Sequence, residues 1–496
     1  AHQIREGNQT IVGLMIENVI ESPDWNLVQN GVADLSGNTV DFAIEAGLGV
    51  ATGESAYGLG YTEVNLDVTI ENNLLNMTEG MSGLGKRSST GLFLGPNPER
   101  MVLEGTYGIV ENVNALIAGN TVIGGNVGLT VGSYEIYDDE AGEEGVFVSV
   151  WNVLVENNHI SDSMVGIAIN NANATIQNND IENCGTGISL TYAGGDLIGN
   201  TISAQIGISL TYPGEVSVVG NQVSFVYDGV YVRDIGAGND WTGKPAVIIS
   251  GNTFTYDDSL MLGPLNMVGG GVVLEGVGNV VVEDNTVDGG IFGIFVNGAY
   301  NLTLSGNTLL NSWDTGVYLN FVYLGWVESN VVMYSGSYGV FAYDGCWYLT
   351  IGNNTIADGA GTGLEVTDTN RETVIYNNDI TGNSWGMDVE DSLWIIDGAA
   401  KVARNGVWFD GAIEVRSGGT LAIQDVSTFD YDGDVLLVME GGLLSASNSN
   451  FVGNSQLKVY GTLWANLCLF EGYDIYLGPT SEAEIRGGAI LWYEWA

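Results

Sequence analysis

One short phrase recurs along the chain at a nearly constant spacing, and it restricts the fold more than any other feature. Each copy is an Asn followed two residues later by an apolar residue, and successive copies lie 21, 21, 21, 31, 33, 22, 23, 24 and 24 residues apart. A period of 21 to 24 residues with two longer intervals is typical of a solenoid, whose repeats pack only on their neighbours. The repeated asparagines are Asn158, Asn179, Asn200, Asn221, Asn252, Asn285, Asn307, Asn330, Asn354 and Asn378.

Two alternating apolar segments accompany each of these asparagines. A Gly-apolar-X-apolar phrase follows, as in Gly187-Ile188-Ser189-Leu190, and an alternating segment such as Val216-Ser217-Val218 precedes the Asn. Short runs with a period of two, bounded by Gly and Asn, predict strands rather than helices. Three short strands per coil predict an all-β parallel β-helix of roughly 17 to 20 coils, with loop insertions.

The repeated asparagines themselves are interpreted as structural. Asn tolerates the left-handed conformation that tight turns require. Amides at the same place in successive coils can also hydrogen-bond up the stack. We therefore expect a ladder of asparagines and not a catalytic set.

These Gly-Asn-Thr-Ile and Gly-Ile-X-Leu phrases resemble the right-handed parallel β-helix repeat superfamily, whose founding members are similar to pectate lyase. The resemblance covers about residues 110–400 and is strongest to the secreted and archaeal cell-surface branch. It implies a right-handed coil but little about activity, because the family holds polysaccharide lyases, glycosidases, epimerases, phage tailspikes, adhesins and surface-layer proteins.

The repeat divides the chain into four stretches. We expect an N-terminal cap or first strand at 1–32, irregular coils with insertions at 33–149, regular coils at 150–395, and C-terminal coils with Gly-Gly repeats and an aromatic end at 396–496.

The charge balance excludes several partners. The chain has 12 Lys and Arg against 60 Asp and Glu, a formal net charge of −48, which disfavours nucleic acid and anionic membranes. No apolar run is long enough to span a membrane as a helix. The first residue is Ala and not Met, which fits a secreted, cell-surface protein with a removed signal peptide.

The X position of the Gly-apolar-X-apolar phrase should face outward and carries a column of aromatic residues. Such a column usually marks an interaction site, either a subunit interface or a platform for sugars. The alternative is that the insertions at 234–246 and 256–270 cover it. The candidate interface or platform residues, together with the aromatic chain end, are Tyr231, Phe295, Tyr318, Phe341, Trp492, Tyr493 and Trp495.

Two carboxylates continue this column in adjacent coils. Glu365 and Asp388 would lie near the separation that a retaining glycosidase pair uses. A solvated face or a shared cation explains such a pair better. No Arg or Lys stands in a cluster of acids, as lyase chemistry would need. Enzyme activity is therefore disfavoured, and we expect no required cofactor.

Calcium binding is more plausible than catalysis, because hard cations prefer oxygen-rich loops. A merely solvated acidic loop is the alternative. The candidate calcium ligands are Asp138, Asp139, Glu140, Glu143, Glu144, Asp257 and Asp258.

Five Asn-X-Ser/Thr sequons predict N-glycosylation, at Asn8, Asn76, Asn173, Asn301 and Asn353. The three cysteines, Cys184, Cys346 and Cys468, lie several coils apart, too far for an intrachain disulfide. Buried thiols are expected, with a bridge between subunits as the alternative.

Two functions fit these observations. The first is an extracellular structural protein that assembles with copies of itself into a cell-surface layer, sheath or filament. The second is a polysaccharide-binding adhesin or a carbohydrate-active enzyme on the same β-helix. The expected partners are other copies of the chain and surface glycans.

Overall fold

The computed structural model describes residues 2–6, 9–23, 27–41, 43–57, 61–77, 90–96, 108–132, 146–234, 247–260, 269–367, 370, 372–433 and 435–491. The chain forms two compact units. Unit 1 comprises 1–237, 246–248 and 257–265, and unit 2 comprises 238–245, 249–256 and 266–496.

Each unit is built from three faces of parallel strands. Face A contains the Gly-apolar-X-apolar phrase, face B precedes the repeated Asn, and face C follows it. Several strands continue from one face to the next.

In unit 1, face A consists of β2 (Gln9–Pro23), β5 (Ala43–Tyr57), β8 (Thr90–Pro96), β11 (Val127–Gly132), β14 (Val165–Asn170), β16 (Asp180–Thr191), β18 (Thr201–Thr211) and β21 (Asp228–Arg233). Face B consists of β3 (Leu27–Ser36), β6 (Tyr61–Glu71), β9 (Gly108–Ala118), β12 (Val146–Glu156), β15 (Asn173–Gln177), β17 (Gly194–Ile198) and β19 (Val216–Val219). Face C consists of β4 (Thr39–Asp41), β7 (Leu74–Asn76), β10 (Thr121–Ile123), β13 (His159–Ser161), the first residues of β16 and β18, and β20 (Gln222–Phe225). The strand β1 (His2–Glu6) pairs antiparallel with β2.

In unit 2, face A consists of β24 (Gly270–Glu283), β26 (Phe292–Ser305), β28 (Thr315–Glu328), β30 (Tyr338–Asp344), β33 (Thr362–Val366), β36 (Trp385–Ile396), β37 (Ala399–Val415), β38 (Thr420–Tyr431), β41 (Asn450–Gly453), β44 (Leu469–Glu471) and β47 (Ala489–Leu491). Face B consists of the later parts of β24, β26, β28, β36 and β37, with β31 (Trp347–Gly352), β34 (Thr373–Tyr376), β39 (Val435–Val438), β42 (Gln456–Val459) and β45 (Asp474–Leu477). Face C consists of β23 (Thr253–Tyr256), β25 (Thr286–Asp288), β27 (Thr308–Leu310), β29 (Val331–Met333), β32 (Thr355–Ala357), β35 (Asp379–Thr381), the first residues of β37 and β38, β40 (Leu443–Ser447), β43 (Thr462–Asn466) and β46 (Glu482–Arg486). The strand β22 (Val247–Ser250) and the short 3₁₀ helix η2 (Asp258–Leu260) complete the described elements.

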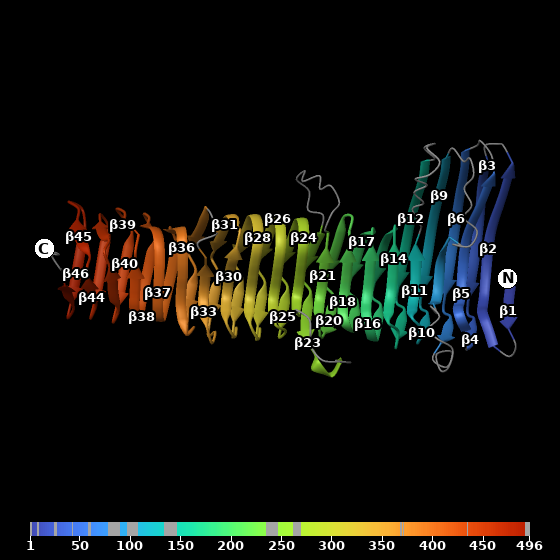
Figure 1. Ribbon diagram of the computed structural model, residues 1–496, viewed down its shortest axis with the longest axis horizontal. Coiled ribbons are helices and arrows are strands. Elements are labelled where there is room, and N and C mark those ends of the chain that lie inside the picture. Colours follow the sequence, from blue (N-terminus) through green and yellow to red (C-terminus); the bar gives the residue numbers. More distant parts are fainter. Residues whose placement is uncertain are drawn as a thin grey trace. The chain divides into compact units, whose positions relative to one another are not determined.

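The strands stack in the register that the repeat predicts. Ile160 pairs with Ile181 and Ile181 with Ile202 on face C of unit 1, so like residues lie above one another. Figure 1 shows this stacking of strands within each unit. The predicted all-β parallel solenoid with three strands per coil is therefore confirmed. Among the described residues, no helix is long and apolar enough to cross a membrane.

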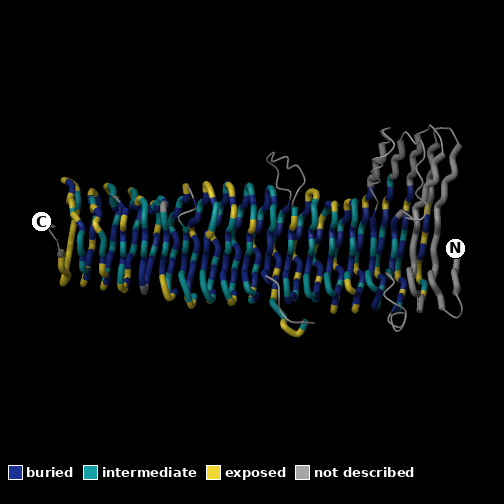
Figure 2. The backbone as a smooth tube through the Cα atoms, viewed as in Figure 1, coloured by how far each residue is buried: buried dark blue, intermediate teal, exposed yellow. Residues whose placement is uncertain are grey.

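The interior of each unit is filled by the apolar positions of this alternation. Leu190, Leu302 and Leu304 are 0% exposed, whereas their neighbours in the strand are less buried, and Figure 2 shows the same alternation along the strands. The Gly of the face A phrase is needed for close approach, not for a special dihedral angle. A Cβ on Gly187 would lie 2.4 Å from Ile202 Cγ2 and 2.6 Å from the carbonyl oxygen of Gly207 in the next coil.

The left-handed residue of the recurring turn precedes the repeated Asn. Asn157, Asn178 and Gly199 have φ values of 55°, 53° and 61°, whereas the repeated asparagines that follow them have no positive φ. Our expectation that the repeated Asn itself takes the left-handed conformation was wrong, because the chain reverses one residue earlier. This explains why Gly or Asn so often stands before the repeated residue.

Candidate functional site

The repeated asparagines lie in a hydrogen-bonded ladder in each unit. Each Nδ2 donates to the Oδ1 of the Asn in the next coil, at 2.8 to 3.0 Å. In unit 1 the ladder contains Asn38, Asn73, Asn120, Asn158, Asn179, Asn200 and Asn221. In unit 2 it contains Asn252, Asn285, Asn307, Asn330, Asn354 and Asn378. These amides are engaged with one another and with backbone carbonyls, so the ladder holds the coils together.

The aromatic column of unit 2 lies on face A, but it is not a continuous exposed stripe. The rings of Phe295 and Tyr318 stack with centroids 5.0 Å apart and planes 5° apart, so they cover each other's faces. Phe341 is only 9% exposed, since the centroid of the Tyr338 ring lies 4.3 Å from that of Phe341. Val273, which occupies the X position of β24 and pairs in register with Phe295, is 3% exposed. The expected outward exposure is therefore wrong at these two positions.

The other residues predicted to form the interface or sugar platform lie in unit 1 or outside the described residues. Tyr231 belongs to unit 1, where it is half-buried on β21. Trp492, Tyr493 and Trp495 lie outside the described residues, as does most of the two insertions that we considered as covers for the column.

Glu365 and Asp388 are neighbours, as the coil spacing suggested. They pair in register on β33 and β36, and both side chains are half-buried. Burial raises the pKa of Glu365 to about 7, with further contributions from the carboxylates of Asp388 and Glu390. Burial also raises the pKa of Asp388. Glu365 therefore holds its proton part of the time near neutral pH, beside a second half-buried acid.

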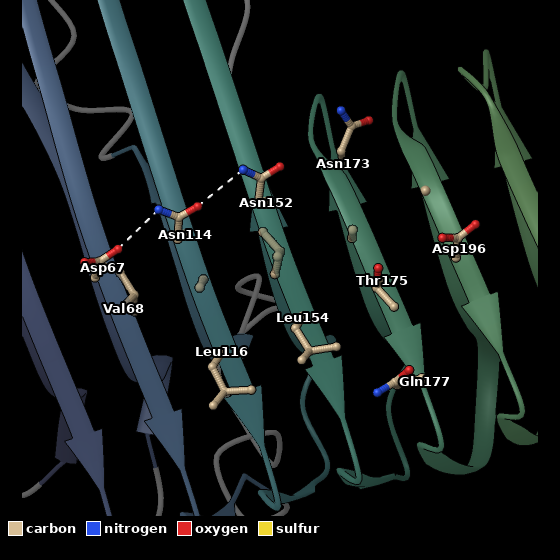
Figure 3. A pocket seen from close by; sticks show the side chains of 14 residues that line it. Asp67, Val68, Asn114, Leu116, Asn152, Leu154, Asn173, Thr175, Gln177 and Asp196 are labelled. Atoms are coloured by element: carbon tan, nitrogen blue, oxygen red, sulfur yellow. Dashed lines mark hydrogen bonds between the residues drawn. The ribbon is translucent and has the colours of Figure 1, made fainter.

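A groove that sequence reasoning missed opens on face B of unit 1. It has a volume of about 840 Å³ and crosses β6, β9, β12, β15 and β17 (Figure 3). One line of polar side chains runs across it in register, from Asp67 through Asn114 to Asn152. Asn114 Nδ2 donates to Asp67 Oδ1 at 3.2 Å, and Asn152 Nδ2 donates to Asn114 Oδ1 at 3.3 Å. In the next coil, Asn173 continues this line.

A second line across the same groove changes from apolar to polar. Leu116 and Leu154 pair in register, followed by Thr175 and Asp196. The side chains of both lines point out from the strands in Figure 3. The outward positions of face B, such as Asn114 and Leu116 in the alternating run of β9, carried the signal that would have identified this groove.

A second groove, also missed, lies on face B of unit 2. Its volume is about 620 Å³. Its lining residues are Leu324, Trp326, Tyr348, Thr350, Glu372, Thr373, Val374, Ser392 and Leu393. Tyr323 and Trp347 each stand one residue before a lining residue, and their side chains are 39% and 41% exposed.

The predicted calcium ligands are only partly described. The acidic insertion with Asp138, Asp139, Glu140, Glu143 and Glu144 lies outside the described residues. Asp257 Oδ1 accepts hydrogen bonds from the backbone N–H and hydroxyl of Ser259, so it caps η2, where Asp258 is the first residue. Calcium binding stays a prediction.

The sequons differ in how accessible their asparagines are. Asn173 and Asn353 are exposed, and Asn76 is half-buried. Asn301 Nδ2 donates to Asn279 Oδ1 at 2.9 Å, so the atom that would carry a glycan is already engaged. Asn8 lies outside the described residues.

The three cysteines are buried and free. Burial raises the pKa of Cys184 and of Cys346 to about 11, and it also raises that of Cys468. The thiols therefore stay protonated and behave as small apolar side chains.

Comparison with known proteins agrees with this architecture. Residues 107–256 and 144–290 match the sequence model of a right-handed β-helix region, and residues 244–407 match that of the periplasmic copper-binding protein NosD. No curated protein matches the chain. The expected resemblance to right-handed β-helix proteins is thus confirmed, without distinguishing an archaeal branch.

Solved tailspike structures are also similar to the chain. A mutant tailspike of E. coli bacteriophage HK620, in complex with a pentasaccharide, is 12% identical over 92% of this chain and 68% of that chain, with a TM-score of 0.21. The Dettilon tailspike gp208 is 12% identical over 75% of this chain and 62% of that chain, with a TM-score of 0.15.

The residues of the NosD-like stretch do not fit a copper site. The stretch 244–407 contains no His, and its single Cys, Cys346, is 0% exposed with its pKa raised to about 11. Within the described parts of the chain, no three His, Cys, Asp or Glu side chains gather into a metal-binding group. We therefore derive no copper chemistry for this chain.

Proposed function

We propose that this parallel β-solenoid is a protein of the periplasm or cell exterior that binds polysaccharide, with the groove of unit 1 as its binding site. The observation that carries the proposal is the register of polar side chains across that groove. Amides and carboxylates that repeat from coil to coil offer the same hydrogen-bonding groups at intervals of about 4.8 Å. A repeated array of this kind suits a polymer of repeating hydroxylated units.

The two lines of the groove have complementary roles in this proposal. The carboxylate of Asp67 and the amides of Asn114 and Asn152 hydrogen-bond sugar hydroxyls, while Leu116 and Leu154 contact the apolar face of a sugar ring. Because the groove is open, an extended chain can lie across several coils without threading into a cavity.

Charge selects among polysaccharides. The chain carries a net charge of −48, and Asp67 and Asp196 both line the groove. An acidic polymer would be repelled, so we expect an uncharged polysaccharide as the ligand. Support for a location outside the cytoplasm comes from the match to a family whose members are named periplasmic.

Titration with uncharged and acidic polysaccharides tests this proposal. Asn152→Ala should weaken binding of the uncharged polymer about tenfold, because it removes the central amide of the polar line. Gln222→Ala, an exposed amide on β20 of the same unit, serves as the control and should bind as the unaltered chain does. Equal affinities of the two variants, or tighter binding of the acidic polymer, would contradict the proposal. Newly formed reducing ends in the same mixtures would test the carbohydrate-active alternative.

Self-assembly into a surface layer, sheath or filament is the second candidate function. It is favoured by large exposed side chains on unit 2, with Trp313 52%, Phe321 56% and Tyr334 51% exposed. With a net charge of −48, copies of the chain repel one another, so we expect assembly to need a divalent cation. Negative-stain electron microscopy with calcium should show ordered arrays that a chelator disperses. Single particles under both conditions would exclude this function.

A further inference from the structure

The outward line of polar side chains in the groove of unit 1 has a fixed direction. Asn152 Nδ2 donates to Asn114 Oδ1, and Asn114 Nδ2 donates to Asp67 Oδ1. An ionised carboxylate can only accept, so Asp67 sets the direction in which the amides donate. Each donor therefore points to the preceding coil, and each Oδ1 is left to accept a hydrogen bond from the coil that follows.

This line breaks between Asn152 and Asn173, although the two residues pair in register. Both side chains are exposed, and within the described parts of the chain no hydrogen bond joins them (Figure 3). The Asn173 amide makes no side-chain hydrogen bond to any described residue. Since neighbouring coils lie about 4.8 Å apart, the break presents an open acceptor, Asn152 Oδ1, close to the open donors of Asn173 Nδ2.

An aliphatic surface lies beside this break. Leu154 stands two residues after Asn152 on β12, about 6.6 Å along the strand and on the same outward face. Leu116 pairs with Leu154 in register, and both side chains are half-buried. None of the described residues that line this groove is aromatic, so a sugar cannot stack on a ring here. The groove offers amides next to aliphatic side chains instead.

These features define the chemical group that fits the break. It accepts a hydrogen bond from Asn173 Nδ2, donates one to Asn152 Oδ1, and has an apolar end that contacts Leu154. A sugar hydroxyl meets the first two requirements but has no apolar end. The acetamido group of an N-acetylated amino sugar meets all three, because its carbonyl oxygen accepts, its N–H donates and its methyl group packs on leucine. It is also uncharged, so the net charge of −48 does not repel it.

We propose that the groove of unit 1 selects polysaccharides of N-acetylated amino sugars, with an acetamido group in the break between Asn152 and Asn173. The proposal rests on the function proposed above and names the class of sugar that this groove takes. The groove continues over the coils on either side of the break, so the neighbouring sugars of the polymer lie along the rest of it.

Two oligosaccharides that differ only in this group test the proposal. Cellohexaose and chitohexaose share a β-1,4-linked backbone, and chitohexaose carries an acetamido group where cellohexaose has a hydroxyl. The chain is prepared without N-glycosylation, because Asn173 is also a sequon. It should bind chitohexaose about tenfold more tightly than cellohexaose in titration calorimetry. Equal affinities, or tighter binding of cellohexaose, would overturn the proposal.

Asn173→Asp locates this preference in the groove. The new carboxylate still accepts from a hydroxyl, but it cannot donate to the carbonyl oxygen of an acetamido group. We expect chitohexaose to bind about tenfold more weakly and cellohexaose to bind with little change. Gln222→Glu makes the same change of charge at an exposed position on β20 and should leave both affinities unchanged. If Asn173→Asp keeps the preference for chitohexaose, the acetamido group binds elsewhere and the proposal is wrong.

Failure of this proposal differs from failure of the function on which it rests. If Asn152→Ala weakens binding of both oligosaccharides and neither is preferred, the groove binds uncharged polysaccharide without selecting the acetamido group. If the unaltered chain binds neither oligosaccharide, both proposals are wrong.

Discussion

Asn307→Ala should lower the free energy of unfolding by about 3 kcal/mol or more, because it removes one rung of the ladder in unit 2. The side chain is 0% exposed. Its Nδ2 donates to Val282 O at 2.8 Å, and its Oδ1 accepts from the backbone N–H and Nδ2 of Asn285 at 3.1 and 3.0 Å. Alanine leaves these buried groups without partners, and each such loss destabilises by about 1 to 3 kcal/mol.

Chemical denaturation of the full chain measures this effect, and hydrogen exchange locates it in the coils around position 307. Asn297→Ala is the control. Asn297 is exposed and accepts one side-chain hydrogen bond, from Asn320 Nδ2, so its loss should destabilise by less than about 1 kcal/mol. If both variants lose the same stability, the ladder does not hold the coils together as described.

Gly207→Ala should destabilise unit 1 by about 3 kcal/mol, although it adds only one methyl group. A Cβ at this position would lie 2.2 Å from Val223 Cγ1 and 2.5 Å from the carbonyl oxygen of Gly229. The carbonyl oxygen belongs to the backbone of the next coil and cannot turn away as a side chain can. The coils would have to separate locally, which would weaken both the pairing and the packing.

Gly214→Ala provides a matched comparison in the same unit. Its Cβ would find no atom closer than 3.7 Å, and Gly214 has no positive φ. We expect this variant to be as stable as the unaltered chain or slightly more so, since Ala reduces the entropy of the unfolded chain. Thermal unfolding followed by circular dichroism compares the two. Similar melting temperatures would show that the Gly phrase is not required for close approach of the coils.

The fold was predictable because its two requirements recur in many successive coils up to Asn378. The Asn hydrogen-bonds through its amide to the Asn of the next coil, and the Gly lets neighbouring coils approach closely. Each repetition of the two residues strengthens the same signal in the sequence. Glu365 and Asp388 could be placed side by side for the same reason, because their positions within the repeat are equivalent. Regular spacing thus gives the neighbours of a residue on any face of the coil.

The groove of unit 2 could not be predicted in this way, because it depends on departures from alternation. The alternating pattern assigns each strand residue to the inside or the outside. It gives no direction for Leu324 within β28, Tyr348 within β31 or Glu372 just before β34, because all three have positive φ values. Likewise, the near-complete burial of Phe341 depends on how the Tyr338 ring is oriented, which spacing does not specify.

The ladder gives each unit a direction. Every rung donates from one coil to the coil that follows it in the chain, as from Asn158 to Asn179 and from Asn179 to Asn200. A coil that has left the ribosome therefore keeps unsatisfied donors until its successor is synthesised and docks. Co-translational folding should thus advance with a delay of one coil. Shortening a unit from its C-terminal side would remove the Oδ1 acceptor of its last rung. Shortening it from its N-terminal side would leave an Oδ1 unused and would also remove a carbonyl acceptor, such as Ile117 O for Asn158 Nδ2.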